Sequence, residues 1–340
     1  GGAGGDVPVP TMLALCEDPS VVGTPFYLMS FVQGHVFTKP GLDALPSPAH
    51  RRAVYDAMAD TLGALHKIDP ERIGLGSFGS SGGHRSGRGS RPRSTGASWS
   101  ERQLERWARQ YSLSLIGDAN PEPVVTALIE WLRANRPVAE PGGRLVHGDF
   151  RLDNIVFESP VGPGPAGTGK DKDKDKDKPS PGRGVLAVLD WELSTLGSPY
   201  GDVAYCCMPY HLPPPSSSSQ SAGAPAAYPA FAGSIPPAGV PTEAEFVQRW
   251  CVASGLPNPQ TRTERVAGDP RGAKKPVWPF YVALSLFRGA AILAGVRARA
   301  AMGNASAANA REAGGLVETL AARALVVAGV PVGSIPRPVS

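Results

Sequence analysis

The chain contains little cysteine, and its cysteines are not arranged to bind zinc. It has four in 340 residues, with no Cys-x-x-Cys pair and no Cys/His spacing typical of a zinc site: Cys16, Cys206, Cys207 and Cys251. We expect the adjacent Cys206 and Cys207 to be packed in the interior. This usage favours a reducing compartment.

A strong excess of charge of one sign is also missing. Lys and Arg together number 34 and Asp and Glu number 30, which leaves a net charge of +4. The chain has no basic helix and no interleaving of basic with aromatic residues. We therefore expect no nucleic-acid partner.

Only one apolar run is long enough to raise the question of a membrane span. Val277–Val296 is nearly all apolar, and a helix of that length would match the thickness of a bilayer. Arg288 lies near its middle and Pro279 near its start, and a central arginine is costly in lipid. The run therefore predicts a buried core helix, with no membrane partner.

Four segments have too few apolar residues to contribute to a core. They are rich in Gly, Ser, Pro, Arg or alternating Lys and Asp, and they span residues 76–98, 159–184, 212–239 and 257–275. Such compositions bury too little apolar surface to offset the entropy lost on ordering. All four are predicted to be disordered insertions.

The rest of the chain predicts a strand-rich beginning and a helical remainder. Met12–Leu15 and Thr24–Val32 are predicted to be strands of a hairpin that ends at Gln33-Gly34. Helices are predicted to begin at Ser47-Pro48, at the capping boxes Ser100–Gln103 and Thr242–Glu245, and at Pro123. This order favours an α+β fold.

Two motifs carry most of the functional information. The first is Leu145–Phe157, where an apolar run ends in His-Gly-Asp and an asparagine follows five residues after that aspartate. The second is Val188-Leu189-Asp190, an apolar run that ends in an acidic residue. Either motif alone is common, in turns or at helix caps. Their order and spacing together predict the groups that phosphoryl transfer to a hydroxyl requires.

These groups have distinct predicted roles. Asp149 is the predicted general base, which would accept the proton of the attacking hydroxyl. Asn154 and Asp190 offer oxygen ligands to the magnesium that bridges the ATP phosphates. Arg151 either offsets charge on the transferred phosphate or is a surface arginine.

Three further residues have predicted supporting roles. His147 is expected to brace the loop through hydrogen bonds, and Asp202 to hold the loop backbone. Glu192 either supports the metal ligands or touches the metal.

The two motifs together resemble the catalytic and metal-binding loops of the aminoglycoside phosphotransferase and choline kinase-like family. Members of this family are related to protein kinases and act on small molecules. The resemblance implies a protein-kinase-like fold. Residues 1–34 would be a remnant of the small β lobe and hinge, and residues 35–340 a mostly helical large lobe. It also implies ATP as the phosphate donor, with the backbone of Ser30 and Val32 bonded to adenine and Met29 lining the pocket.

Four segments are similar to one branch of this family, the kinase-like domain found alone in bacteria and fused to acyl-CoA dehydrogenases in eukaryotes. They are Pro25–Met29, His147–Asn154, Leu189–Gly197 and Phe280–Gly303. The likeness implies a small-molecule acceptor of the acyl-CoA type, such as a hydroxyacyl-CoA. It also implies a fused dehydrogenase in the full-length product. Fused relatives occur in mitochondria and peroxisomes. The expected compartments are therefore the cytoplasm, the mitochondrion and the peroxisome.

The chain departs from the family pattern at its beginning. Kinase-like domains carry a Gly-rich loop, a strand lysine and a helix glutamate before the hinge, yet no Lys or Arg precedes Lys39. The leading hypothesis is a magnesium-dependent kinase of which this chain is a fragment. The alternatives are a non-catalytic pseudokinase module that regulates a partner, and a fragment of an acyl-CoA dehydrogenase fusion protein.

Overall fold

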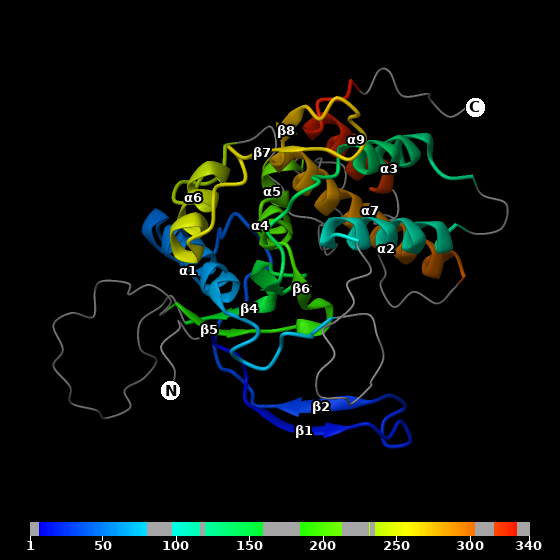
Figure 1. Ribbon diagram of the computed structural model, residues 1–340. Helices are drawn as coiled ribbons and strands as arrows, with labels where there is room; N and C mark the ends of the chain where they lie inside the picture. The colour runs from blue at the N-terminus through cyan, green and yellow to red at the C-terminus, as the bar shows by residue number, and fades with distance from the viewer. Residues whose placement is uncertain are drawn as a thin grey trace, which may run out of the picture. The chain divides into compact units, whose positions relative to one another are not determined.

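The computed structural model describes residues 7–79, 97–115, 120–158, 184–212, 231, 235–302 and 316–331. Its helices are α1 (Pro48–Lys67), α2 (Trp99–Leu113), α3 (Pro123–Asn135), α4 (Pro199–Cys206), α5 (Met208–His211), α6 (Glu243–Ser254), α7 (Trp278–Ala301) and α9 (Val317–Val327). Its strands are β1 (Met12–Cys16), β2 (Phe26–Met29), β3 (Arg144–Val146), β4 (Ile155–Phe157), β5 (Val185–Val188), β6 (Thr195–Gly197), β7 (Thr263–Arg265) and β8 (Lys274–Pro276). All are labelled in Figure 1 where there is room.

The strands of the described residues form four antiparallel pairs: β1–β2, β3–β6, β4–β5 and β7–β8. Contacts divide the chain into two units. Unit 1 comprises Gly1–Ile68, Asp149–Leu193 and Pro236–Leu256, and unit 2 comprises Asp69–Gly148, Ser194–Ile235 and Pro257–Ser340. This division differs from the predicted boundary after residue 34.

In unit 1, α1 and α6 lie side by side (Figure 1). Their apolar faces meet around the fully buried Trp250, whose indole N–H donates a 2.9 Å hydrogen bond to Nδ1 of the buried His66. A Cβ on Gly63 would lie 2.4 Å from Cβ of Ala253, so the two helices approach too closely for any side chain at that position.

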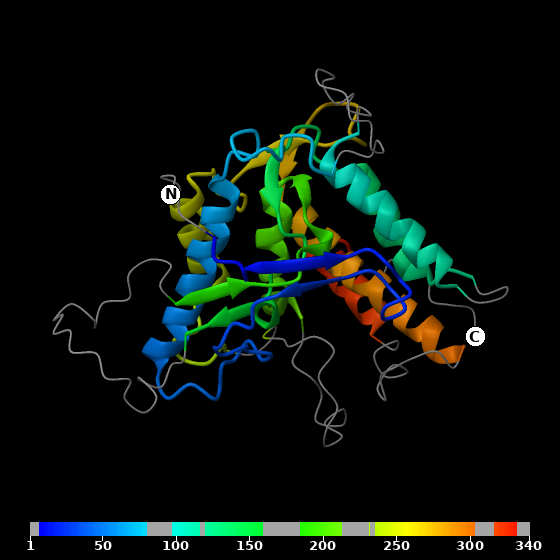
Figure 2. The same cartoon turned by 90° about the horizontal axis from the view of Figure 1, so that it is seen from below.

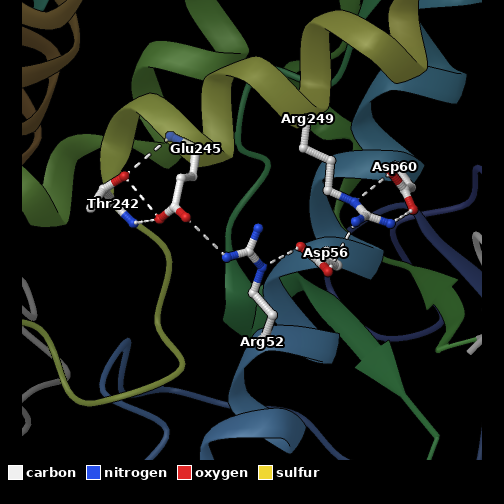
Figure 3. Close-up of polar contacts among 6 residues, drawn as sticks. All are labelled: Arg52, Asp56, Asp60, Thr242, Glu245 and Arg249. Atoms are coloured by element: carbon white, nitrogen blue, oxygen red, sulfur yellow. Dashed lines mark hydrogen bonds and ion pairs between the residues drawn. The ribbon is translucent and has the colours of Figure 1, made fainter.

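Ion pairs run along the edge of the same two helices (Figure 3). Arg249 of α6 contacts Asp60 at 2.6 Å and Asp56 at 2.9 Å, and Arg52 also contacts Asp56 at 2.9 Å. Because these side chains are partly exposed, water screens the attraction, and packing of the apolar faces dominates the pairing of the helices.

The start of α6 carries the predicted capping box, which the structure confirms. The Thr242 hydroxyl accepts a hydrogen bond from the Glu245 N–H, and the Glu245 carboxylate accepts one of 2.8 Å from the Thr242 N–H (Figure 3). The pKa of Glu245 is held below its ordinary value of 4.5. The largest cause is the hydrogen bond from the Thr242 backbone, followed by those from the Thr242 side chain and from Arg52.

In unit 2, α7 is the central helix. It packs against α2, α3, α4 and α9. Its length and composition would allow it to cross a membrane, but most of its apolar stretch is buried inside the protein. The prediction of a core helix over Val277–Val296 is therefore confirmed.

Some sequence predictions differ from the structure. A disordered insertion was expected at residues 257–275, but β7 and β8 form a hairpin there, with Thr263 opposite Pro276. Backbone pairing orders this segment without a large apolar content. The predicted insertions at 76–98, 159–184 and 212–239 lie largely outside the described residues.

The capping residue of α2 also differs from the prediction. The helix begins at Trp99 rather than after Ser100, because the Ser98 hydroxyl accepts the Glu101 N–H. Ser98 and Glu101 have the Ser-x-x-Glu spacing of a capping box, two residues earlier than the predicted Ser100–Gln103.

We predict that Thr242→Ala lowers the free energy of unfolding by about 1 kcal/mol, because it removes the hydroxyl that caps α6. Urea unfolding at pH 7 would measure this, with the exposed Thr38→Ala as the matched control. An equal effect of both substitutions would contradict a capping role.

The contribution of Glu245 should depend on pH in a defined direction. Because its pKa is depressed in the folded state, its stabilisation is present above the ordinary pKa of 4.5 and is lost as pH falls through the folded value. Glu245→Ala should therefore destabilise the protein at pH 7, and less at lower pH. A loss independent of pH would contradict this.

Candidate active site

The loop Asp149–Asn154 of unit 1 is held by its own side chains. The Asn154 amide nitrogen donates to the Asp149 backbone carbonyl at 2.9 Å and to the Asp149 carboxylate at 3.0 Å. Phe150 is fully buried and anchors the loop, and the short 3₁₀ turn Leu152–Asn154 leads directly into β4. The loop therefore presents the carboxylate of Asp149 in a fixed position relative to Asn154.

The next strand pair brings Asp190 beside the same loop. Ile155 of β4 lies opposite Val188 of β5, and the Leu189 N–H donates a 2.8 Å hydrogen bond to the Asn154 carbonyl. Asp190 follows immediately, so two residues 36 positions apart in sequence become neighbours through strand pairing.

The backbone of Asp190 is unusual. Its φ of +65° lies in the left-handed region, and Leu42 is the one other non-glycine with positive φ among the described residues. Its side chain is exposed. Such a conformation costs of order 1 to 3 kcal/mol and is common at binding sites.

The donor atoms in this region suit magnesium. The Asn154 side-chain nitrogen faces Asp149, so its Oδ1 is directed away from that carboxylate. Amide and carboxylate oxygens are the ligands that magnesium prefers, and it keeps several waters. The described part of the chain contains no cluster of three or more His, Cys, Asp and Glu that could hold a metal. Two protein ligands would leave the other coordination positions of a magnesium ion to water and phosphate oxygens.

Arg151 and Glu192 lie at the edge of this arrangement. The Arg151 guanidinium forms an ion pair with Asp153 within the loop, and both side chains are partly exposed. Glu192 is exposed on the 3₁₀ turn Trp191–Leu193, where the Trp191 indole N–H donates to the Val188 carbonyl at 2.9 Å.

The predicted hinge follows the β1–β2 hairpin, which Figure 2 shows in blue. The Ser30 N–H already donates to the Thr11 carbonyl at 2.8 Å, so that N–H is not available to adenine in this conformation. Met29 is exposed and Val32 is half-buried. Phe31, just after the hairpin, is 91% exposed, so an apolar side chain of the predicted hinge lies in water.

Sequence reasoning missed how the hinge segment is attached. His35 exchanges two 2.8 Å backbone hydrogen bonds with Phe157 of β4, and the Val188 N–H of β5 donates to the Pro8 carbonyl at 2.8 Å. A Cβ on Gly34 would lie 2.5 Å from the Phe157 carbonyl oxygen. The chain on either side of the hairpin is therefore bound to β4 and β5. Asn154 directly precedes β4, and Asp190 follows shortly after β5.

In unit 2, the buried Asp202 of α4 holds the residues that end β3. Its carboxylate, in a side chain only 2% exposed, accepts hydrogen bonds from the His147 N–H at 2.7 Å and the Gly148 N–H at 2.9 Å. His147 is itself fully buried. Two charge-assisted bonds to consecutive N–H groups fix the Val146–His147 and His147–Gly148 peptides.

Comparison with known proteins gives consistent matches. A family model described as "Phosphotransferase enzyme family" matches residues 2–167, which include Asp149, Arg151 and Asn154 and end before Asp190. Acyl-CoA dehydrogenase family member 10 of Mus musculus is 35% identical over 323 residues, which are 94% of this chain and 24% of that protein. The chain thus spans about a quarter of the length of that relative.

Solved structures show the same likeness. A candidate aminoglycoside phosphotransferase from Ralstonia eutropha has a TM-score of 0.67 and 35% identity, and the match covers 95% of this chain and 79% of that one. The aminoglycoside phosphotransferase APH(4)-Ia, solved with AMP-PNP and hygromycin B, has a TM-score of 0.51 at 16% identity, over 98% and 80% of the two chains. The α+β, protein-kinase-like fold predicted from the sequence is thereby confirmed.

The strain at Asp190 generates a stability prediction. Asp190→Gly should have a free energy of unfolding about 1 kcal/mol higher than Asp190→Ala, because glycine adopts positive φ without a Cβ clash. Urea unfolding of both variants would measure the difference. The exposed Asp43, which lacks positive φ, is the control, and there Gly should be less stable than Ala. The same order of stability at both positions would contradict the strain.

Proposed function

The chain belongs to the phosphotransferase enzyme family, and from this premise we propose that it transfers the terminal phosphoryl group of ATP to a hydroxyl of a small molecule. The observation that carries the proposal is the position of Asn154. Its side chain binds Asp149 and its backbone carbonyl binds the residue before Asp190. Asn154, a proposed metal ligand, thus links the proposed base Asp149 to the strand end that leads to Asp190, the other proposed ligand.

In the proposed reaction, Asp149 is the general base. One of its carboxylate oxygens accepts a hydrogen bond from the Asn154 amide, and the carboxylate would accept the proton of the acceptor hydroxyl. As the hydroxyl oxygen bonds to the γ-phosphorus, the bond from that phosphorus to the β–γ bridging oxygen breaks and ADP leaves. The hydrogen bond from Asn154 orients the carboxylate.

Asn154 and Asp190 are the proposed magnesium ligands. When bound, magnesium neutralises charge on the phosphate oxygens. The strand pairing between β4 and β5 holds the two ligand residues on one rigid hairpin. The exposure of Asp190 leaves its carboxylate open to solvent and to a phosphate–metal complex.

The remaining predicted site residues are assigned supporting roles. The ion pair of Arg151 with Asp153 favours a role in bracing the loop, since contact with the transferred phosphate would require that pair to open. Asp202 holds the backbone of His147 and Gly148. Glu192 is exposed on the turn after Asp190, where it would support the metal ligands.

The proposed acceptor is a hydroxyl on a molecule of the acyl-CoA type. Support comes from the mouse relative, which is named an acyl-CoA dehydrogenase family member and is about four times as long as the matched region. A phosphotransferase fused to such an enzyme would act on a related metabolite. We further propose that the full-length product includes such a dehydrogenase.

A second candidate is a module that binds nucleotide or acyl-CoA without turnover. One observation favours it: Tyr27 and Leu28 are exposed in the β1–β2 hairpin, next to the segment proposed to bind adenine. Such a module would keep the fold and lose the reaction.

Calorimetry with ATP and magnesium tests the proposed metal site. The full chain should bind ATP in a magnesium-dependent manner, and Asp190→Ala should lose that dependence because one of two protein ligands is gone. Asp43→Ala is the matched exposed control. Equal magnesium dependence in the Asp190→Ala variant would remove Asp190 as a ligand, and no binding by the unmodified chain would contradict the proposal itself.

Turnover separates the two candidate functions. Asp149→Asn should lower kcat roughly a hundredfold or more and leave KM for ATP nearly unchanged, because it removes the general base but not the nucleotide contacts. ADP release would be measured with a 3-hydroxyacyl-CoA and with water as acceptors, beside Asp43→Asn. Magnesium-dependent ATP binding without any turnover would favour the non-catalytic module.

A further inference from the structure

Arg288 occupies an unusual position in α7. It is the only charged residue between Trp278 and Val296, a stretch of α7 in which most residues are buried. A guanidinium taken from water into such surroundings loses hydration that specific contacts must replace. Its contacts therefore indicate why an arginine stands there.

Two aromatic rings hold the guanidinium. The Arg288 Cζ lies 4.3 Å from the ring centroid of Tyr205 in α4 and 5.2 Å from that of Trp107 in α2. Both distances are within the range of cation–π attraction, which is strengthened when the ring and cation are shielded from water. Three helices of unit 2 thus converge on one side chain.

The guanidinium is also bonded to the backbone. The Arg288 Nη1 donates a hydrogen bond to the carbonyl oxygen of Gly148. Gly148 has a φ of +82°, in the left-handed region, and its N–H donates to Asp202. Both polar groups of this one residue are therefore held, its N–H by Asp202 and its carbonyl by Arg288.

The carbonyl of Gly148 belongs to the peptide group that joins it to Asp149. Rotation of that peptide plane would turn the backbone of Asp149 and change the direction of its side chain. A hydrogen bond at the carbonyl resists such rotation, because a flipped carbonyl would leave the half-buried guanidinium without this partner. The Asp202 bonds act on the preceding N–H groups and do not restrain this plane directly.

We propose that Arg288 is a positioning residue for the reaction: it fixes the Gly148–Asp149 peptide plane and thereby orients Asp149, without touching the acceptor or the nucleotide. The role rests on the proposed function, in which Asp149 is the base. Trp107 and Tyr205 hold the guanidinium plane in the orientation that aims Nη1 at the carbonyl. Lysine could donate to the carbonyl but would not present a flat cation to the two rings.

Amide hydrogen exchange tests the positioning directly and requires no turnover. In the full chain, Arg288→Met should increase exchange in peptides covering residues 147–154 and leave α9 unchanged, whereas Arg288→Lys should give a smaller local increase. Arg299→Met is the control, since Arg299 is an exposed arginine on the same helix. Exchange over 147–154 equal to that of the control would overturn the proposal. A general increase that includes α9 in both Arg288 variants would also overturn it, since it would indicate a purely structural role.

Kinetics provide the second measurement. With ATP, magnesium and water as the acceptor, Arg288→Met should lower kcat roughly tenfold to a hundredfold with KM for ATP unchanged, the signature of a misplaced base. Arg288→Lys should recover part of that loss. If Arg288→Met does not fold, Arg288→Lys carries both measurements, and a Lys variant indistinguishable from the control would overturn the role. Absence of turnover in the unmodified chain would contradict the proposed function alone, because the exchange result would still decide the restraint on the loop.

Discussion

The hydrogen bonds of Asn154 are the constraint on which the candidate site depends. The side-chain nitrogen binds both the backbone and the carboxylate of Asp149, and the backbone carbonyl accepts the Leu189 N–H. An isolated carboxylate would sample several rotamers, and one loop alone would not place a distant aspartate. The Asn154 amide restricts the rotamers of Asp149, and strand pairing between β4 and β5 fixes the position of Asp190. The cost is backbone strain at Asp190, whose φ is left-handed.

Buried charge in unit 2 serves backbone geometry. Asp202 binds two consecutive N–H groups, and Arg288 binds the carbonyl that follows them. Each charged group would be costly alone, yet each is held by donors, acceptors or aromatic faces from other elements. A change of backbone conformation at His147 or Gly148 would leave Asp202 or Arg288 without its hydrogen-bond partner, and the lost hydration of that charge would not be replaced. The backbone before Asp149 is therefore held more strongly than by ordinary loop contacts.

Sequence reasoning reached the parts of the structure that depend on local chemistry. Ser47 and Thr242 cap their helices as predicted, and Val277–Val296 is a core helix, since capping and apolar content act over a few residues. The β7–β8 hairpin was missed because its stability comes from backbone pairing between polar residues. The attachment of His35 to Phe157 and the hydrogen bond from Arg288 to Gly148 were missed because each joins residues more than 100 positions apart.

The hairpin β1–β2 differs physically from the rest of unit 1. Leu15, Tyr27 and Leu28 are exposed in it, and a two-stranded hairpin is marginally stable without an apolar face packed against something else. The loop Asp149–Asn154 does not share this weakness, because Phe150 within it and Ile155 directly after it are fully buried. The groups proposed for chemistry are therefore held by a packed core, whereas the groups proposed for adenine are held mainly by backbone pairing. Affinity for the nucleotide base and chemistry at Asp149 thus depend on different parts of the fold, and a loss of the first would leave the geometry of the second intact.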